Sequence, residues 1–201
     1  MAKTLQFLFD FASPNCWLAH RALPPLLART GARLVIEPVL LGGIFKATGN
    51  QSPFHAFANV KGKLDYERLE IARFVAAHGL TQFRMNPHFP VNSLLLMRAF
   101  VAAREAGQGD AFLEAGLAGL WQEGLDLSKP DVLQPRLDQA GLDGAALVAR
   151  AGAPEIKAAL AQATEAAVAR GVFGLPTFFV GDEMFFGKER LAQIEAELAR
   201  P

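Results

Sequence analysis

The pattern of apolar and polar residues predicts strands near the start of the chain. Residues 4–10 form an apolar run that Asp10 closes, and residues 33–40 form a second run rich in branched side chains. Both patterns are typical of buried strands. The stretch between them, from Pro14 to Thr30, predicts a helix that is bent at Pro24-Pro25 and ended by Gly31. Two strands joined by a helix in this way are expected to be parallel.

The middle of the chain has a different pattern. Residues 41–53 contain two adjacent glycines and are expected to form a loop. Beyond them, apolar residues recur at helical spacing between breaks that contain glycine or proline. The expected helices cover residues 66–78, 92–106, 111–122, 132–140 and 154–170, with a shorter helix just before the last of these.

Strand patterns return at the end of the chain. Residues 177–180 and 183–186 flank Gly181-Asp182 and predict a β-hairpin, and residues 188–199 predict an amphipathic helix. The order β-α-β, helical block, β-β-α predicts an α/β fold, namely a thioredoxin fold with a large all-helical insertion. We expect a thioredoxin-like domain formed by 1–45 and 170–201, and an inserted helical domain formed by 46–169.

Composition narrows the classes of protein to consider. The chain has 201 residues, of which 51% are hydrophobic and 20% are charged, and its formal net charge is zero. These values are typical of a globular protein, and without a basic block we expect no nucleic acid or membrane partner. No apolar run is long enough for a membrane span, and the first residues show no signal-peptide pattern. We therefore expect a cytoplasmic protein.

The segment Ser13-Pro14-Asn15-Cys16 stands where a thioredoxin fold carries its redox motif, at the start of the first helix. Cys16 is the only cysteine, so the chain cannot form an internal disulfide. Ser13 before Pro14 is a common helix N-cap. At the same place, the Ser13 hydroxyl could donate a hydrogen bond to the thiolate of a bound ligand and lower the pKa of that thiol.

Gly174-Leu175-Pro176-Thr177 is the second candidate element. Pro176 could simply begin an edge strand. A proline at this place in a thioredoxin fold is typically cis and faces the start of the first helix. We therefore predict a cis Leu175-Pro176 bond, with the backbone of Leu175 free to pair with an extended peptide-like ligand.

Four segments carry a resemblance to a known family. They are Ser13-Pro14 with Leu18-Ala19, residues 45–50, residues 86–92 and residues 171–180. In order and over nearly the full length, they resemble the 2-hydroxychromene-2-carboxylate isomerases. These enzymes are related to kappa-class glutathione transferases within the DsbA-like thioredoxin superfamily.

The resemblance implies a glutathione site in the thioredoxin-type cleft, with Ser13 beside the glutathione sulfur. Asn50 matches an asparagine of the family that contacts glutathione. Lys63 matches a lysine near the glycyl carboxylate of glutathione and the substrate, although Lys61 could take this role. Without the family, Asn50 is an ordinary turn residue and Lys63 an ordinary exposed lysine.

The γ-glutamyl end of glutathione is expected near Gly187, where the chain departs from the pattern of the family. Relatives follow this glycine with a short polar or acidic pair, whereas this chain has Lys188 and Glu189. Glu189 could bind the ammonium group of the ligand and Lys188 its carboxylate. Alternatively, both residues form a solvated first turn of the last helix.

The substrate pocket and Cys16 leave alternatives open. Aromatic walls for a bicyclic substrate could include Phe9, Phe11 and Phe45. His88 and Asn92 could line the same pocket or serve as a helix entry and cap. The four histidines lack metal-ligand spacing. Cys16 could be a reactive thiolate, but its position one turn inside the helix favours a packed, inert thiol.

The activity implied by the resemblance is a glutathione-dependent isomerisation in aromatic catabolism. It converts 2-hydroxychromene-2-carboxylate-type hemiketals and trans-benzylidenepyruvates into one another, in a homodimeric enzyme with a small aromatic substrate. Two alternatives remain: a kappa-class-like transferase or peroxidase, and a non-catalytic binder of thiol peptides with a chaperone-like role.

Overall fold

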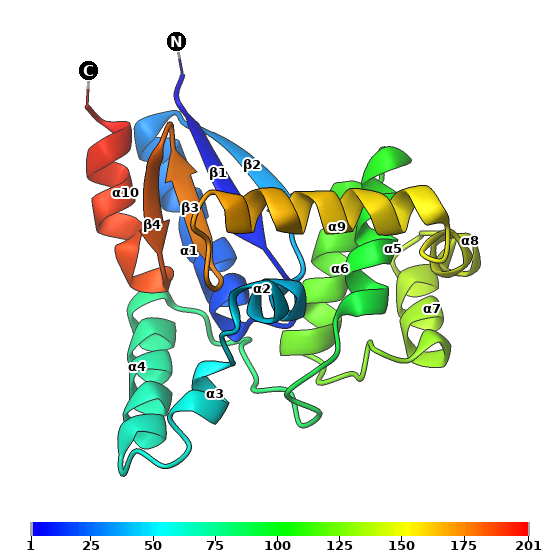
Figure 1. Cartoon of the computed structure of the whole chain (residues 1–201), viewed down its shortest axis with the longest axis horizontal. Helices are drawn as coiled ribbons and strands as arrows, with labels where there is room; N and C mark the ends of the chain where they lie inside the picture. The colour runs from blue at the N-terminus through cyan, green and yellow to red at the C-terminus, as the bar shows by residue number, and fades with distance from the viewer. Residues whose placement is uncertain (1, 201) are drawn as a thin grey trace.

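The computed structural model describes residues 2–200 and contains a four-stranded mixed sheet (Figure 1). The strands are β1 (Thr4–Phe9), β2 (Arg33–Pro38), β3 (Thr177–Val180) and β4 (Glu183–Phe186), in the order β2-β1-β3-β4. β1 pairs parallel with β2 and antiparallel with β3, and β3 pairs antiparallel with β4. The predicted parallel start and the predicted hairpin are therefore confirmed.

The two central strands lie in the core because their side chains are apolar on both faces. All four residues of β3 are buried, and so are the last three residues of β1. Phe7 of β1 stacks on Phe178 of β3, with ring centroids 4.7 Å apart. Buried aromatic pairs of this kind add stability beyond the area they bury. This contact joins the two ends of the chain.

Helices cover both faces of the sheet. α1 (Pro14–Thr30) packs against α10 (Leu191–Leu198), which also contacts β3, whereas α5 (Leu94–Glu105) and α9 (Pro154–Ala169) contact β2. Figure 1 shows α9 crossing in front of the sheet and α1 behind it. The other helices are α2 (Leu41–Thr48), α3 (Pro53–Ala56), α4 (Lys63–His78), α6 (Gly109–Trp121), α7 (Pro130–Gln139) and α8 (Gly144–Arg150).

The expected loop over residues 41–53 is wrong, because residues Leu41–Thr48 form the helix α2. Leu40, the N-cap residue of this helix, makes no side-chain capping bond. Instead, the carboxylate of Asp10 accepts a hydrogen bond from the Leu41 N–H at 2.8 Å, and the Thr164 hydroxyl accepts one from the Leu40 N–H at 2.9 Å. Residues distant in sequence thus satisfy the start of α2, which local breaker rules do not reveal.

The short helix α3 was not predicted, and the other elements match their expected positions within a few residues. The last helix begins with a short 3₁₀ turn, η1 (Lys188–Arg190), before α10. The expected domain boundary between residues 45 and 46 falls inside α2, while the boundary between 169 and 170 coincides with the end of α9. Within residues 2–200, no helix is long and apolar enough to cross a membrane.

Candidate functional site

The N-terminus of α1 carries Ser13 as its N-cap. Its backbone is extended (φ −89°, ψ 113°), and its hydroxyl oxygen accepts a hydrogen bond from the Cys16 N–H at 3.2 Å. Pro14 has no N–H, and the Asn15 N–H has no hydrogen-bond partner within residues 2–200. A free backbone donor at the positive end of a helix dipole favours a bound anion.

Leu175 and Pro176 face this helix start. The peptide bond between them is cis, as the sequence predicted. The Ser13 hydroxyl donates to the Leu175 carbonyl oxygen over 3.4 Å, a long bond for two oxygen atoms. The Leu175 N–H has no partner in the described part of the chain. The site therefore contains a weakly held hydroxyl hydrogen beside two backbone donors without acceptors.

Lys188 is brought to the same place because the Gly187 N–H donates to the Pro176 carbonyl oxygen at 2.9 Å. The Lys188 side chain is only 2% exposed and forms an ion pair with Glu189, which is half exposed. Its ammonium nitrogen also lies 5.4 Å from the centre of the Phe74 ring. The alternative of a solvated first turn is thus wrong for Lys188.

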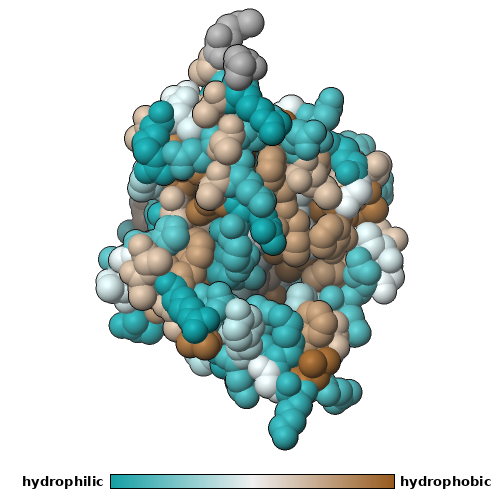
Figure 2. Space-filling view, turned by 90° about the vertical axis from the view of Figure 1, so that its left-hand side faces the viewer, coloured by the Kyte–Doolittle hydropathy of each residue, from teal (hydrophilic) through white to brown (hydrophobic). Residues whose placement is uncertain are grey.

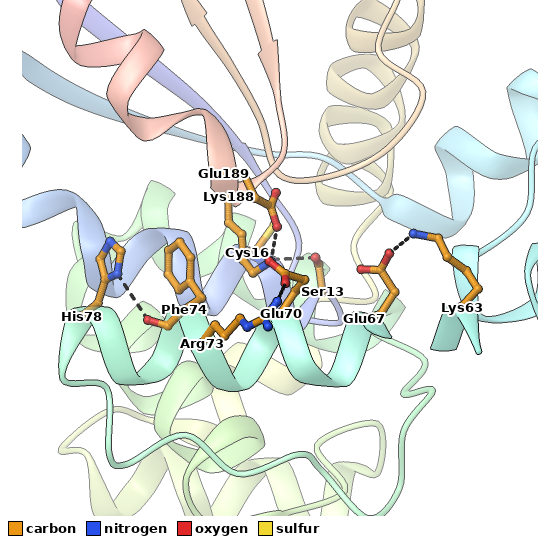
Figure 3. Close-up of polar contacts among 10 residues, drawn as sticks. All are labelled: Ser13, Cys16, Lys63, Glu67, Glu70, Arg73, Phe74, His78, Lys188 and Glu189. Atoms are coloured by element: carbon orange, nitrogen blue, oxygen red, sulfur yellow. Dashed lines mark hydrogen bonds and ion pairs between the residues drawn. The ribbon is translucent and has the colours of Figure 1, made fainter. Parts of the chain in front are cut away.

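Helix α4 forms the opposite wall, as Figure 3 shows, with Glu67, Glu70 and Phe74 on the side of α4 toward Ser13 and Lys188. A hydrogen bond from Arg73 lowers the pKa of Glu70, and the positive charge of Lys188 acts in the same direction. Glu70 is therefore an anion at neutral pH. The wall places negative charge opposite the buried ammonium group of Lys188.

Cys16 lies behind this surface with no solvent exposure. Burial raises the pKa of its thiol to about 12, because an enclosed site disfavours the thiolate. The thiol is therefore neutral over the physiological range of pH. This environment supports the packed, inert interpretation over the reactive one.

Cys16→Ala is expected to keep most of the activity of the protein, at a stability cost of about 1 kcal/mol from the small cavity it leaves. Alkylation of wild-type Cys16 by iodoacetamide should be slow in native protein and fast in urea, as followed by mass spectrometry. Rapid native alkylation, or loss of activity by orders of magnitude in a folded Cys16→Ala protein, would show that Cys16 is the nucleophile.

Asn50 and Lys63 are not brought into contact with Ser13 by any bond in the described residues. Asn50 is exposed just beyond Gly49, which ends α2. Lys63 forms an ion pair with Glu67 one turn along α4, away from Ser13 in Figure 3. The glutathione-binding roles of Asn50 and Lys63 stay predictions.

The expectation that Phe9 and Phe11 line a substrate pocket is wrong. Both rings are fully buried, and they pack edge to face with centroids 4.8 Å apart. They form part of the core because both pack edge to face against Phe100 of α5, and Phe11 also packs against Phe112 of α6. Phe45, on α2, is half buried, so it retains some surface for a ligand.

His88 and Asn92 are both exposed. The Asn92 side-chain oxygen accepts a hydrogen bond from the Leu94 N–H at 3.0 Å, at the start of α5. This bond supports the helix-entry alternative for Asn92. The pocket role of His88 stays a prediction.

Sequence reasoning missed an exposed aromatic pair beside Leu175. Phe173 and Phe186 are 44% and 38% exposed, and their ring centroids lie 4.5 Å apart. Gly174 lies under this pair, because a Cβ there would be 3.0 Å from the Phe186 ring. Figure 2 shows hydrophobic surface gathered around a hollow on the face that includes this edge of the sheet. The sequence signal for this pair was a phenylalanine just before the Leu175-Pro176 bond and another at the end of the hairpin that follows.

Comparison with known proteins first defines the class. The model of the DSBA-like thioredoxin domain matches residues 4–199. The structure of a probable DsbA oxidoreductase from Streptomyces coelicolor aligns with a TM-score of 0.71 at 19% identity, covering 99% of this chain and 92% of that one. The fold is thus the expected α/β thioredoxin fold of the DsbA-like class.

Closer relatives define the family within this class. The chain is 31% identical to 2-hydroxychromene-2-carboxylate isomerase of Sphingobium xenophagum, covering 98% of this chain and 99% of that protein. A structure of 2-hydroxychromene-2-carboxylate isomerase aligns with a TM-score of 0.83 at 27% identity, covering 98% and 95%. The chain belongs to the 2-hydroxychromene-2-carboxylate isomerase family. Human glutathione S-transferase kappa 1 is 25% identical over 95% of this chain and 88% of its own.

Proposed function

We propose that this protein is a glutathione-dependent isomerase that interconverts 2-hydroxychromene-2-carboxylate-type hemiketals and trans-benzylidenepyruvates. The observation that carries the proposal is the Ser13 hydroxyl at the free end of α1, opposite the cis Leu175-Pro176 bond. The neutral thiol of Cys16 lies behind it and leaves the nucleophile to a ligand. The names of the relatives supply the reaction class.

The residues present fit glutathione. The unpartnered Leu175 N–H and the carbonyl oxygen of the same residue suit the extended cysteinyl backbone. Lys188 offers a buried ammonium group to the α-carboxylate at the γ-glutamyl end, and Glu189 offers a half-exposed carboxylate to the α-ammonium group. Asn50 and Lys63 would complete the site from α2 and α4. The Lys188 ammonium group pairs with one carboxylate only and can therefore donate hydrogen bonds to a second anion.

Ser13 would hold the ligand sulfur in its anionic form. Its hydroxyl donates to the Leu175 carbonyl oxygen over 3.4 Å, which is a weak hydrogen bond. Little stability is therefore lost when the hydroxyl donates to a ligand thiolate instead. The Asn15 N–H and the α1 dipole act in the same direction. When bound, glutathione supplies a thiolate that adds reversibly to a conjugated carbon, which makes the double bond rotatable.

The substrate would lie against the exposed Phe173–Phe186 pair, whose rings offer an apolar surface next to Leu175. Lys63, the first residue of α4, is the candidate cation for the substrate carboxylate, and Lys61, just before the helix, is the alternative. Both lysines lie at the N-terminal end of α4, where Lys63 forms its ion pair with Glu67. The charge of Glu70 on the facing wall would repel a misplaced carboxylate.

The test combines glutathione binding with turnover. Calorimetry should show saturable glutathione binding at millimolar concentration or below, and conversion of 2-hydroxychromene-2-carboxylate should require added glutathione. S-methylglutathione is the matched control, because it should bind without supporting conversion. Absence of glutathione binding would contradict the proposal.

The kappa-class relatives favour one alternative in particular. Glutathione-dependent conjugation of an electrophilic acceptor or reduction of a peroxide, without isomerisation of the chromene, would identify a transferase or peroxidase. Glutathione binding with neither reaction would identify a non-catalytic thiol-peptide binder. A homodimer and a cytoplasmic location remain expectations, and sedimentation velocity would test the first.

A further inference from the structure

A cavity lies between α2, α5 and α9, and neither Ser13 nor Leu175 lines it. Its volume is about 380 Å³. That volume falls within the range of roughly 300–1,000 Å³ typical of small-molecule sites. The lining residues recur at helical spacing, so each helix presents one face to it. Those that carry the argument are Leu40, Lys46, Leu94, Arg98, Lys157 and Leu160.

The charged residues around the cavity are predominantly cationic. Lys46, Arg98 and Lys157 come from three different helices, and none forms an ion pair in the described part of the chain. Glu165 is the one acidic residue in the lining. Three unpaired cations facing one space create a positive potential that attracts an anion.

Arg98 gives the strongest indication of what the cavity takes. Its Nε atom is shielded from solvent and has no hydrogen-bond acceptor within residues 2–200. Burying a polar group without a partner is unfavourable, and a buried group of this kind therefore calls for an acceptor. A guanidinium group prefers a carboxylate or phosphate, which can accept two parallel hydrogen bonds from it.

The rest of the lining is aliphatic. Leu40, Leu94 and Leu160 form walls without aromatic rings, and the Thr164 hydroxyl is already used. It accepts from the Leu40 N–H at 2.9 Å and donates to the Leu160 carbonyl oxygen at 2.7 Å. The cavity therefore offers cations at its polar side and only van der Waals contact elsewhere.

We propose that this cavity is a second ligand site, which binds a small amphipathic carboxylate through Arg98 with Lys46 and Lys157 at its mouth. The carboxylate supplies the acceptor that Arg98 lacks, and the aliphatic body of the ligand covers the leucine walls. A carboxylate is favoured over a phosphate ester because half of the lining is apolar and a singly charged head is less costly to desolvate.

Octanoate is the probe for the test, and 1-octanol is its uncharged counterpart. Amide chemical shifts of the full-length protein should change saturably along α2, α5 and α9 on addition of octanoate, and not around Ser13. Octanol should bind at least about tenfold more weakly, because it lacks the charge-assisted hydrogen bonds. Saturating glutathione should leave the octanoate affinity unchanged, which separates this test from that of the proposed function.

Arg98→Gln is expected to weaken octanoate binding by about tenfold or more. Because Arg98 is partly buried, Lys157→Gln on the exposed side provides a second variant, which should weaken binding by a few-fold. Arg104→Gln makes the same charge change on α5 at a residue outside the lining, and should leave binding unchanged. Shifts centred on Ser13 and Leu175, no saturable binding, or equal affinity in Arg98→Gln and Arg104→Gln would each overturn the proposal.

Discussion

Replacing Ser13 by alanine is expected to lower turnover by about 10²–10³-fold while changing the affinity for glutathione much less. The ligand sulfur loses its hydroxyl donor, so the pKa of the bound thiol should rise toward that of free glutathione. The ultraviolet absorbance of the thiolate, followed against pH in the protein–glutathione complex, measures this shift directly. Turnover should fall because less thiolate is present at neutral pH.

The loss of a helix cap must be separated from the loss of the donor. Ser13 also accepts the Cys16 N–H, and removing an N-cap costs about 1 kcal/mol of stability. Asp143 caps α8 in the same way, accepting the Ala146 N–H at 2.9 Å. Asp143→Ala should therefore lose similar stability and keep full turnover. An unchanged thiol pKa in Ser13→Ala would contradict the role assigned to Ser13.

Asp10→Ala is expected to reduce the free energy of unfolding by about 3–5 kcal/mol. The Asp10 carboxylate has no solvent exposure and accepts hydrogen bonds from the Ala12 N–H, the Leu41 N–H and the Ser93 hydroxyl, at 2.8, 2.8 and 3.0 Å. Alanine would leave two partly buried backbone donors and the buried Ser93 hydroxyl without this acceptor. Urea denaturation followed by circular dichroism measures the loss.

Asp138→Ala is the matched control, since this exposed carboxylate also accepts a backbone hydrogen bond, from the Gly144 N–H at 2.9 Å. Asp138 is exposed and accepts only this one bond, so its loss should cost about 1 kcal/mol. If Asp10→Ala costs no more than Asp138→Ala, the network around Asp10 does not stabilise the fold as described.

The pH dependence gives a second check on Asp10. Burial raises its pKa above the ordinary value of 3.8, so the native state holds this proton more tightly than the unfolded chain. Its contribution to stability is then fully present below the unfolded value and declines as the pH rises through the folded value. The cost of Asp10→Ala should accordingly be larger in acid than at neutral pH.

Local sequence patterns were sufficient for the strands and most helices, whereas the cis Leu175-Pro176 bond was predicted from the place of Pro176 in a thioredoxin fold. Their signals lie within a few residues, such as the apolar run of β3 or the Gly181-Asp182 turn. Helix α2 was missed because its start is satisfied by Asp10 and Thr164, which are remote in sequence. Gly43, read as a loop signal, instead permits close packing: a Cβ there would lie 3.0 Å from the Thr164 methyl group.

The candidate site was predictable in the parts that lie on the thioredoxin framework. Ser13 and Leu175 meet because a helix start and a strand start have fixed places in that fold. The depth of a residue was harder to infer. All four of Phe9, Phe11, Phe173 and Phe186 are apolar aromatic residues in or near predicted strands. Phe9 and Phe11 nevertheless lie in the core, whereas Phe173 and Phe186 are exposed. Lys188 lies against Phe74 of α4, which is remote in sequence, so no local pattern predicts its burial.

The pairing of β1 with β3 has a consequence for how the protein is made. β1 is synthesised first, but its partner strand β3 is synthesised only after the whole helical block. Phe7 therefore has to wait for Phe178, with which it pairs in the sheet. Until then β1 can pair only with β2, and its other edge is open to wrong partners. The contact between Ser13 and Leu175 spans 162 residues, so it forms only when almost all of the chain has left the ribosome. A nascent chain stalled before residue 177 should therefore be a ready substrate for chaperones that bind exposed strand edges.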